Sequence, residues 1–331
     1  MQDFKQIIGN ENIIEHLQHA IQAGKVSHSY IIHGEEGMGK KLIASAFAKT
    51  LQCEEGGIQS CNHCKSCMQA ETNNHPDIIW VTHEKKSIGV DDIRLQVNSD
   101  IFVKPYSSSY KIYIIDEAEK LTEQAQNALL KTIEEPPEYA LFLLLVSNIA
   151  TILPTILSRC IQLNLRPVGK EAIMEYLMTN HQIPDYLAEI AANFSGGNVG
   201  KALRYASSEN FDRMKDDVLH ILKNIDDMEL HEIITSLKNI SENKEAIDDY
   251  IDLMILWYRD VLMFKATKNP NLLMYKGELS SIQNQAIRRS YENIDKIIEA
   301  LEKAKLRLRA NVNFDIAIEL MLLTIKENGN G

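Results

Sequence analysis

Short apolar runs and longer amphipathic segments alternate along the first half of the chain. The apolar runs have the length of buried strands and lie at 30–32, 77–81, 110–115 and 141–146. Between them, apolar side chains recur at helical spacing at 11–24, 40–51, 90–98 and 122–135. Such alternation is typical of a three-layer domain in which helices cover both faces of a mostly parallel sheet. The pattern therefore predicts an α/β domain that ends near residue 166.

The pattern changes after Arg166-Pro167, and the rest of the chain is predicted to be helical. Helical spacing continues from 169 to 206, with a break at Gly196-Gly197, and a longer helical stretch runs from 210 to 327. We therefore expect an α/β domain at 1–166, a small helical domain at 167–207 and a larger all-α domain at 208–331.

Composition and charge narrow the class of protein. Hydrophobic residues make up 45% of the 331, which is enough to form buried cores, and we see no apolar run of about 18 residues, the length of a membrane span. The first residues lack the basic-then-apolar order of a signal peptide, so we expect a cytoplasmic protein with no membrane partner. A net charge of −11 gives the whole chain no electrostatic attraction to DNA. Contact with nucleic acid would need a local basic surface or partner proteins.

A phosphate-binding loop follows the first apolar run. Residues 34–41 fit G-x-x-x-x-G-K-(S/T) at every required position except the last. Gly34, Gly37 and Gly39 would let backbone N–H groups surround phosphates, and Lys40 would reach the β- and γ-phosphates. The last position normally supplies a hydroxyl ligand for Mg²⁺, but here it is Lys41, whose ammonium has no lone pair to offer a metal. The loop therefore predicts nucleotide binding and argues against hydrolysis.

Two acidic residues end the third apolar run. Asp116 and Glu117 follow Tyr110–Ile115, which is the Walker B arrangement. In that arrangement Asp116 orients the Mg²⁺ shell and Glu117 polarises the attacking water. Acidic residues after a buried strand are common, but a phosphate loop upstream makes the signal strong.

Four of the five cysteines form a cluster, C-x7-C-x2-C-x2-C, at Cys53, Cys61, Cys64 and Cys67. Four thiolates at this spacing can converge on a tetrahedral Zn²⁺ with a closed coordination shell, so we expect a structural zinc module at 53–67. Two disulfides are an alternative that a reducing cytoplasm opposes, and a redox C-x-x-C pair would leave two cysteines unexplained.

Together these motifs resemble the AAA+ clamp-loader subunits of bacterial DNA polymerase III, and within that family the delta-prime type. The resemblance spans residues 4 to about 205. The matching segments are the phosphate loop, the four-cysteine module, Asp116–Leu121, Asn127–Lys131 running into Glu134–Pro137, Ser147-Asn148 and Ser158–Cys160.

Three departures from the motor subunits of that family weaken the expected ATP site. Lys41 replaces the metal-binding hydroxyl, and Gly200 stands where the resemblance places an arginine that reaches the γ-phosphate. Asn148 stands where motors carry a threonine-type sensor, and it could still bind a phosphate or water. Lys201 and Arg204 are alternative cations, but each lies on a different bearing of the helix from residue 200.

The Ser158-Arg159-Cys160 motif is intact. The resemblance implies that Arg159 acts in trans, as an arginine finger in a neighbouring subunit's ATP site. The simpler alternative is a surface arginine next to a buried cysteine.

The resemblance as a whole implies an AAA+ core, a helical lid and a C-terminal collar in a non-motor subunit. The expected partners are gamma/tau- and delta-type subunits in a hetero-oligomeric ring, with the sliding clamp and primed DNA contacted through the complex. ATP with Mg²⁺ is an expected ligand of the loop, with little or no hydrolysis and no autonomous enzymatic activity. The alternative is a catalytically active gamma/tau-type subunit, which would have to tolerate Lys41.

Overall fold

The computed structural model describes residues 3–83, 86–208, 211–229, 232, 246–310 and 312–329. The chain forms two compact units, Met1–Ala206 and Ser207–Gly331. The predicted domains at 1–166, 167–207 and 208–331 stay predictions.

A five-stranded parallel sheet forms the centre of the first unit, with strand order β2-β3-β4-β1-β5. The strands are β1 (Ser29–His33), β2 (Ile78–Val81), β3 (Lys111–Ile115), β4 (Ala140–Val146) and β5 (Ile161–Asn164). Four of them match the predicted apolar runs to within a residue or two. The sequence did not indicate β5, because only Leu163 of its four residues is buried at the edge of the sheet.

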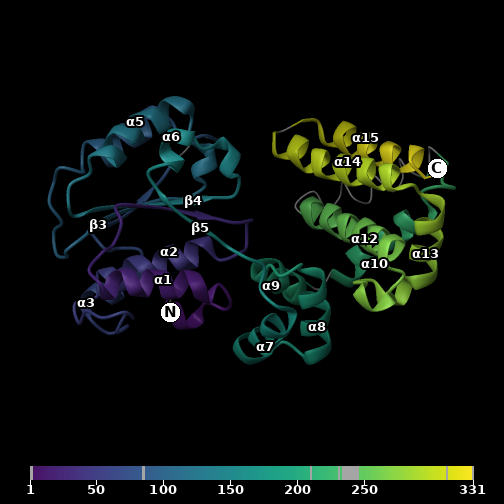
Figure 1. Ribbon diagram of the computed structural model, residues 1–331, viewed down its shortest axis with the longest axis horizontal. Helices are drawn as coiled ribbons and strands as arrows, with labels where there is room; N and C mark the ends of the chain where they lie inside the picture. Colours follow the sequence, from purple (N-terminus) through teal and green to yellow (C-terminus); the bar gives the residue numbers. More distant parts are fainter. Residues whose placement is uncertain are drawn as a thin grey trace. The chain divides into compact units, whose positions relative to one another are not determined.

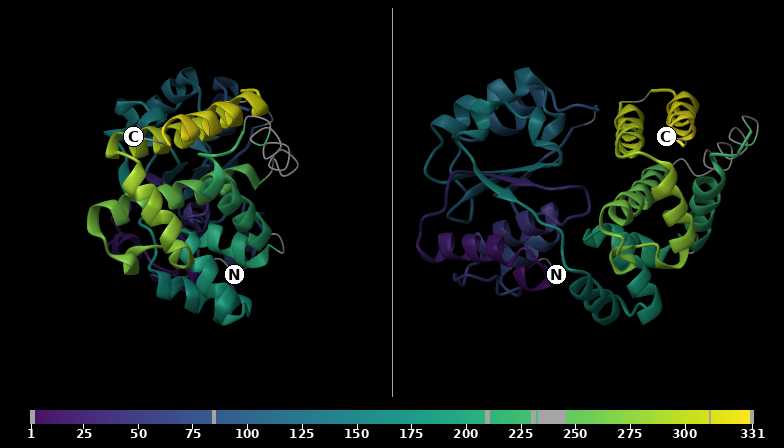
Figure 2. Two further views of the ribbon diagram at one scale, coloured as in Figure 1. Left: turned by 90° about the vertical axis from the view of Figure 1, so that its right-hand side faces the viewer. Right: turned by 45° about the vertical axis from the view of Figure 1, so that its right-hand side comes forward.

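Helices cover both faces of this sheet, as Figure 1 and the right-hand view of Figure 2 show. Side chains of β1 alternate between the faces: Tyr30 packs in the layer with Phe47 of α2, and Ile31 in the layer with Leu129 of α5. All seven residues of β4 are buried, which explains its continuous apolar run. The predicted three-layer α/β domain is therefore confirmed.

The helices of the first unit lie in the segments predicted to be helical, except α3 and α6, which the periodicity did not predict. They are α1 (Glu11–Gln22), α2 (Lys40–Leu51), α3 (Lys65–Glu71), α4 (Val90–Ile93), α5 (Glu123–Glu134), α6 (Pro154–Leu157), α7 (Lys170–His181), α8 (Asp185–Phe194) and α9 (Val199–Ser207). The predicted helix at 90–98 is a single α-helical turn that continues as π-helix from Arg94 to Asn98.

The second unit is helical in its described part. Its helices are α10 (Phe211–Asn224), α12 (Ile247–Thr267), α13 (Leu279–Arg288), α14 (Tyr291–Arg309) and α15 (Phe314–Glu327). The parts of the predicted helical stretch at 230–231 and 233–245 lie outside the described residues. Trp257 is fully buried in this unit, and its indole N–H donates to Gln285 Oε1 at 2.9 Å. None of the helices in the described ranges combines the length and apolar character that spanning a bilayer needs.

Candidate functional site

The phosphate loop lies at the carboxyl end of β1, a strand inside the sheet between β4 and the edge strand β5. Because β3, β4 and β1 are neighbouring parallel strands, the loops that follow them lie at the same edge of the sheet. Gly37 and Gly39 have φ angles of +87° and +94°, which side chains of other residues rarely tolerate. Their conformations turn the chain sharply before α2 begins at Lys40. The loop therefore has the strand–turn–helix context that its motif requires.

Lys40 folds back over the loop. Its ammonium donates to the carbonyl oxygens of Gly34 at 2.6 Å and Glu35 at 2.9 Å, and to the Ser147 hydroxyl at 2.9 Å. Burial lowers the pKa of Lys40, and nearby carboxylates, Glu119 foremost, oppose that change.

Glu119 also connects the loop to β4, because its carboxylate accepts from the Ser147 backbone N–H at 3.1 Å. The roles of Ser147 and Glu119 next to Lys40 were missed at the sequence level. Their positions just after β4 and β3 were the available signal, since loops after adjacent parallel strands meet at one edge.

Lys41 forms an ion pair with Asp116, with Lys41 Nζ 2.6 Å from Asp116 Oδ2. The hydrogen bond to Asp116 raises the pKa of Lys41, so the side chain is an ammonium at neutral pH. The two positions that would share a Mg²⁺ ion are therefore joined to each other. This donor set does not fit Mg²⁺, because Asp116 is already neutralised and Lys41 offers no lone pair.

Glu117 and Asn148 have other contacts. Glu117, at φ +48°, pairs with Lys120 at 2.7 Å and lies 3.9 Å from His83. The Asn148 side chain accepts from the Ala150 N–H at 3.1 Å and caps the turn after β4. In the loop after β4, Ser147 and not Asn148 contacts Lys40. The roles predicted for Glu117 and Asn148 in nucleotide binding stay predictions.

The start of α9 rests directly on the phosphate loop. The Gly200 N–H donates to the Gly37 carbonyl at 2.9 Å, and the Asn198 amide donates to the Glu36 carbonyl at 2.7 Å. A Cβ on Gly200 would lie 2.6 Å from Gly37 Cα, closer than the two atoms can approach. This position has no room for the arginine that the sequence resemblance places there. The neighbouring Lys201 ammonium lies 3.3 Å from Glu35.

Arg159 is held on the surface between the end of α5 and α6. Its guanidinium pairs with Glu134 at 2.8 Å and donates to the Thr155 carbonyl at 2.9 Å, with the side chain 39% exposed. The Ser29 hydroxyl donates to the Arg159 carbonyl at 2.8 Å and so ties the motif to β1. Burial raises the pKa of the adjacent Cys160 thiol. Arg159 is thus a fixed, accessible cation on this unit.

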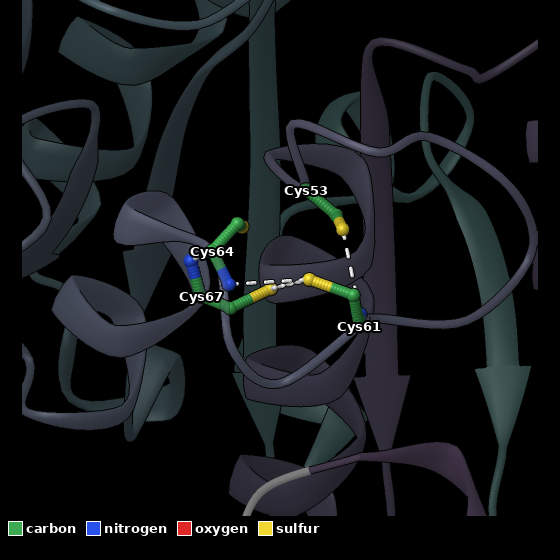
Figure 3. Close-up of side chains that lie close together, drawn as sticks. All are labelled: Cys53, Cys61, Cys64 and Cys67. Carbon is green, nitrogen blue, oxygen red and sulfur yellow. Dashed lines mark hydrogen bonds between the residues drawn. The ribbon is translucent and has the colours of Figure 1, made fainter.

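The four clustered cysteines converge, as Figure 3 shows. Their Sγ atoms all lie within 4.8 Å of one another, and the Cys61 and Cys67 sulfurs are 3.9 Å apart. Sulfurs at the corners of a tetrahedron around Zn²⁺ are about 3.8 Å apart, given Zn–S bonds of about 2.3 Å. A disulfide would need about 2 Å between sulfurs. The cluster can therefore hold a metal ion.

Backbone N–H groups point at the sulfurs, as they do around metal-bound thiolates. The N–H of Cys64 lies 3.3 Å from the Cys61 sulfur, and that of Cys67 lies 3.3 Å from the Cys64 sulfur. Hydrogen bonding, that of the His63 backbone foremost, lowers the pKa of Cys61 to about 7. His63 itself bonds Glu55 at 2.5 Å on the outside of the cluster.

Buried polar contacts attach this module to the core. Lys49 of α2 is 2% exposed and pairs with Glu71 of α3 at 2.5 Å. The Ser66 hydroxyl donates to the Gln52 carbonyl at 2.6 Å, and its oxygen lies 2.9 Å from His75 Nε2. These contacts fix α3 against α2 and the start of β2.

The strand order, the phosphate loop and the acidic pair after β3 together define a P-loop protein of the AAA+ type. Comparisons with known proteins narrow this class. The family model described as "DNA polymerase III, delta subunit" matches residues 9–169. The delta' subunit of DNA polymerase III from Bacillus subtilis is 29% identical over 95% of this chain and 95% of its own length. The tau subunit from the same organism is 30% identical over 96% of this chain, which spans 61% of tau.

Among solved structures, a gamma subunit-related DNA polymerase III protein from Thermotoga maritima aligns with a TM-score of 0.45 and 18% identity, over 96% of this chain and 99% of its own. The family model and the curated relatives agree with each other. The chain is therefore similar to the delta- and gamma/tau-type clamp-loader subunits of bacterial DNA polymerase III.

Proposed function

We propose that this chain is a delta-prime-type, non-motor subunit of the replicative clamp loader. In this role it joins gamma/tau- and delta-type subunits in a ring that loads the sliding clamp onto primed DNA. Similarity to DNA polymerase III subunits supports the complex, and the similarity to a delta' subunit over 95% of each chain supports the subunit type. As a bacterial replication protein it would work in the cytoplasm, with residues 167–207 as its lid and 208–331 as its collar.

The observation that carries the non-motor role is the ion pair between Lys41 and Asp116. Hydrolysis needs a metal that bridges the β- and γ-phosphates and neutralises charge in the transition state. The pair removes two of the groups that would hold this metal. The contact between Gly200 and Gly37 adds support, because an arginine from α9 has no space there.

Arg159 would act in the ATP site of the neighbouring subunit. A guanidinium delivered to the transferring phosphoryl group typically raises the rate about 10³–10⁵-fold, which corresponds to roughly 4–7 kcal/mol of barrier. The bonds to Glu134 and Thr155 hold the guanidinium at the surface and reduce the orientational freedom it would lose on docking. The four-cysteine module would hold a structural zinc ion, since four thiolates leave no open coordination position.

ATP turnover by the reconstituted clamp loader tests this role. Replacing Arg159→Ala should reduce turnover at the neighbouring site by about 10³-fold or more, because the transition state loses its guanidinium. The Arg94→Ala variant removes another exposed arginine of the same unit and serves as the control. Unchanged turnover in the Arg159 variant would reject the finger.

The alternative is a catalytically active gamma/tau-type subunit. Lys40 and the Asp116-Glu117 pair are retained, and a tau subunit is among the relatives. The same assay on the purified chain alone separates the two roles. Turnover clearly above background would identify a motor, and the non-motor role predicts background.

A further inference from the structure

The phosphate loop keeps its glycines and Lys40 but has a fixed cation where P-loop proteins have a metal ligand. In those proteins the hydroxyl after the loop lysine and the aspartate at the end of the apolar Walker B strand hold Mg²⁺ beside the phosphates. Here the two corresponding side chains, Lys41 and Asp116, are 2.6 Å apart and form an ion pair. The positive charge beside Asp116 therefore comes from the Lys41 side chain.

Electrostatics oppose a divalent cation at the same place. An ion bound by Asp116 would lie within a few ångströms of the Lys41 ammonium, and like charges at that separation repel. The ion would also have to displace a charge-assisted hydrogen bond that is already made. Mg²⁺ keeps several waters and needs carboxylate oxygens plus phosphates, and the paired Asp116 is a poor partner for it.

The same ammonium is well placed to receive phosphate oxygens. Lys41 is the second residue of α2, so it lies beside the loop N–H groups and the positive end of the helix. Its side chain is 68% exposed, whereas that of Asp116 is 22% exposed. An ammonium has three N–H donors, and the bond to one carboxylate oxygen uses one of them.

We propose that the Lys41 ammonium takes the place of the divalent cation, so that this loop binds a nucleoside triphosphate without metal. This proposal rests on the proposed non-motor role, in which the loop binds a nucleotide without hydrolysing it. It adds the form in which the nucleotide is bound: the free polyanion instead of its magnesium complex. Such a site holds a nucleotide as a structural ligand, because it does not bind the metal ion that hydrolysis requires.

Calorimetric titration of the purified chain with adenosine 5′-(β,γ-imido)triphosphate tests this, once with EDTA and once with Mg²⁺. The unmodified chain should bind equally well or better in EDTA. The Lys41→Thr variant restores the hydroxyl and should bind about tenfold or more weakly in EDTA than in Mg²⁺, the worth of a charge-assisted interaction. The Lys25→Thr variant removes an exposed lysine elsewhere in the same unit and should behave as the unmodified chain.

Two results would overturn the proposal. The first is that the unmodified chain binds the analogue about tenfold more tightly with Mg²⁺ than with EDTA, because a metal-dependent site behaves in this way. The second is that the unmodified chain binds the analogue neither with EDTA nor with Mg²⁺, although its circular dichroism spectrum is that of a folded protein. Both leave the non-motor role standing, because that role is judged by Arg159 in the reconstituted complex.

Discussion

At the residue scale, the phosphate site departs from the metal-binding form of the phosphate-loop motif at a few side chains. Lys41 closes onto Asp116, and Gly200 lets α9 contact the loop backbone. Neither change disturbs the glycine geometry or Lys40, so the site keeps its shape while its charges are rearranged. The start of α9 is held by hydrogen bonds from Asn198 to the Glu36 carbonyl and from Gly200 to the Gly37 carbonyl.

A Gly200→Ala variant tests this contact. The added Cβ would lie 2.6 Å from Gly37 Cα and should destabilise the first unit by about 1–3 kcal/mol, the usual cost of overpacking. Gly169→Ala is the matched control, because its Cβ would have Glu171 at 3.9 Å as its nearest neighbour. Urea unfolding followed by Trp80 fluorescence, in a Trp257→Phe background, reports on the first unit alone. Equal destabilisation by the two variants would show that the contact is unimportant.

His75 is a second residue whose environment has a measurable consequence. It is 4% exposed; Nδ1 accepts from the Asp77 N–H at 3.1 Å and Nε2 lies 2.9 Å from the Ser66 hydroxyl. Burial lowers the pKa of His75 below its usual value of 6.5. The unfolded chain therefore takes up the proton first, so stability is fully present above pH 6.5 and falls as the pH drops below it.

We expect the free energy of unfolding of the first unit to fall between pH 7.5 and 5.5, and to fall less in a His75→Gln variant. Urea titrations at several pH values, read from Trp80, give both slopes. The exposed His16→Gln variant should keep the slope of the unmodified chain. If His75→Gln and the unmodified chain have the same slope, His75 does not contribute to the pH dependence.

At the element scale, the cysteine module is a short excursion between α2 and β2 that buries little apolar surface. Cys67 and Ala70 are the buried hydrophobic residues of α3. Its attachment includes the Lys49–Glu71 pair and the hydrogen bonds of Ser66, and the loop at 53–64 is bonded to Asp3 and Gln18 through Asn62 and the Ile58 carbonyl. A metal ion held by the four sulfurs would add a cross-link that a small core cannot supply.

Purified chain should therefore contain about one zinc ion per molecule under reducing conditions, measured by atomic emission. A Cys64→Ser variant should lose most of this metal and unfold at a lower temperature in its first unit. Cys160→Ser, which changes the cysteine outside the cluster, should keep the metal. A zinc content near zero in well-folded, unmodified chain would contradict the assignment.

At the scale of the whole molecule, the α/β unit carries the candidate sites described above, and the second unit is helical, with a separate core, in its described part. The sites in the first unit lie on different elements: the phosphate loop after β1, Arg159 before β5 and the cysteines after α2. In the second unit, buried Trp257 and Gln285 connect α12, α13 and α10 through hydrogen bonds.

The amino-acid sequence by itself determined the strands, the helices and the residues of the motifs, because local periodicity and the glycine, lysine and cysteine spacings are properties of short segments. It placed β1 to β4 within a residue or two, but missed β5, whose apolar pattern is weak at a sheet edge. Cys53 to Cys67 could be read as one cluster, since the chain between them is too short to separate them.

Only the tertiary structure decided what the side chains at the loop contact. That Lys41 reaches Asp116, that Ser147 and not Asn148 meets Lys40, and that Gly200 lies on Gly37 are contacts between residues 75 to 163 positions apart. Their meeting depends on the order of strands in the sheet and on how α9 packs against the first unit. The strand order and the packing of α9 depend on the apolar surface buried over the whole unit, and no single segment of the sequence specifies that burial.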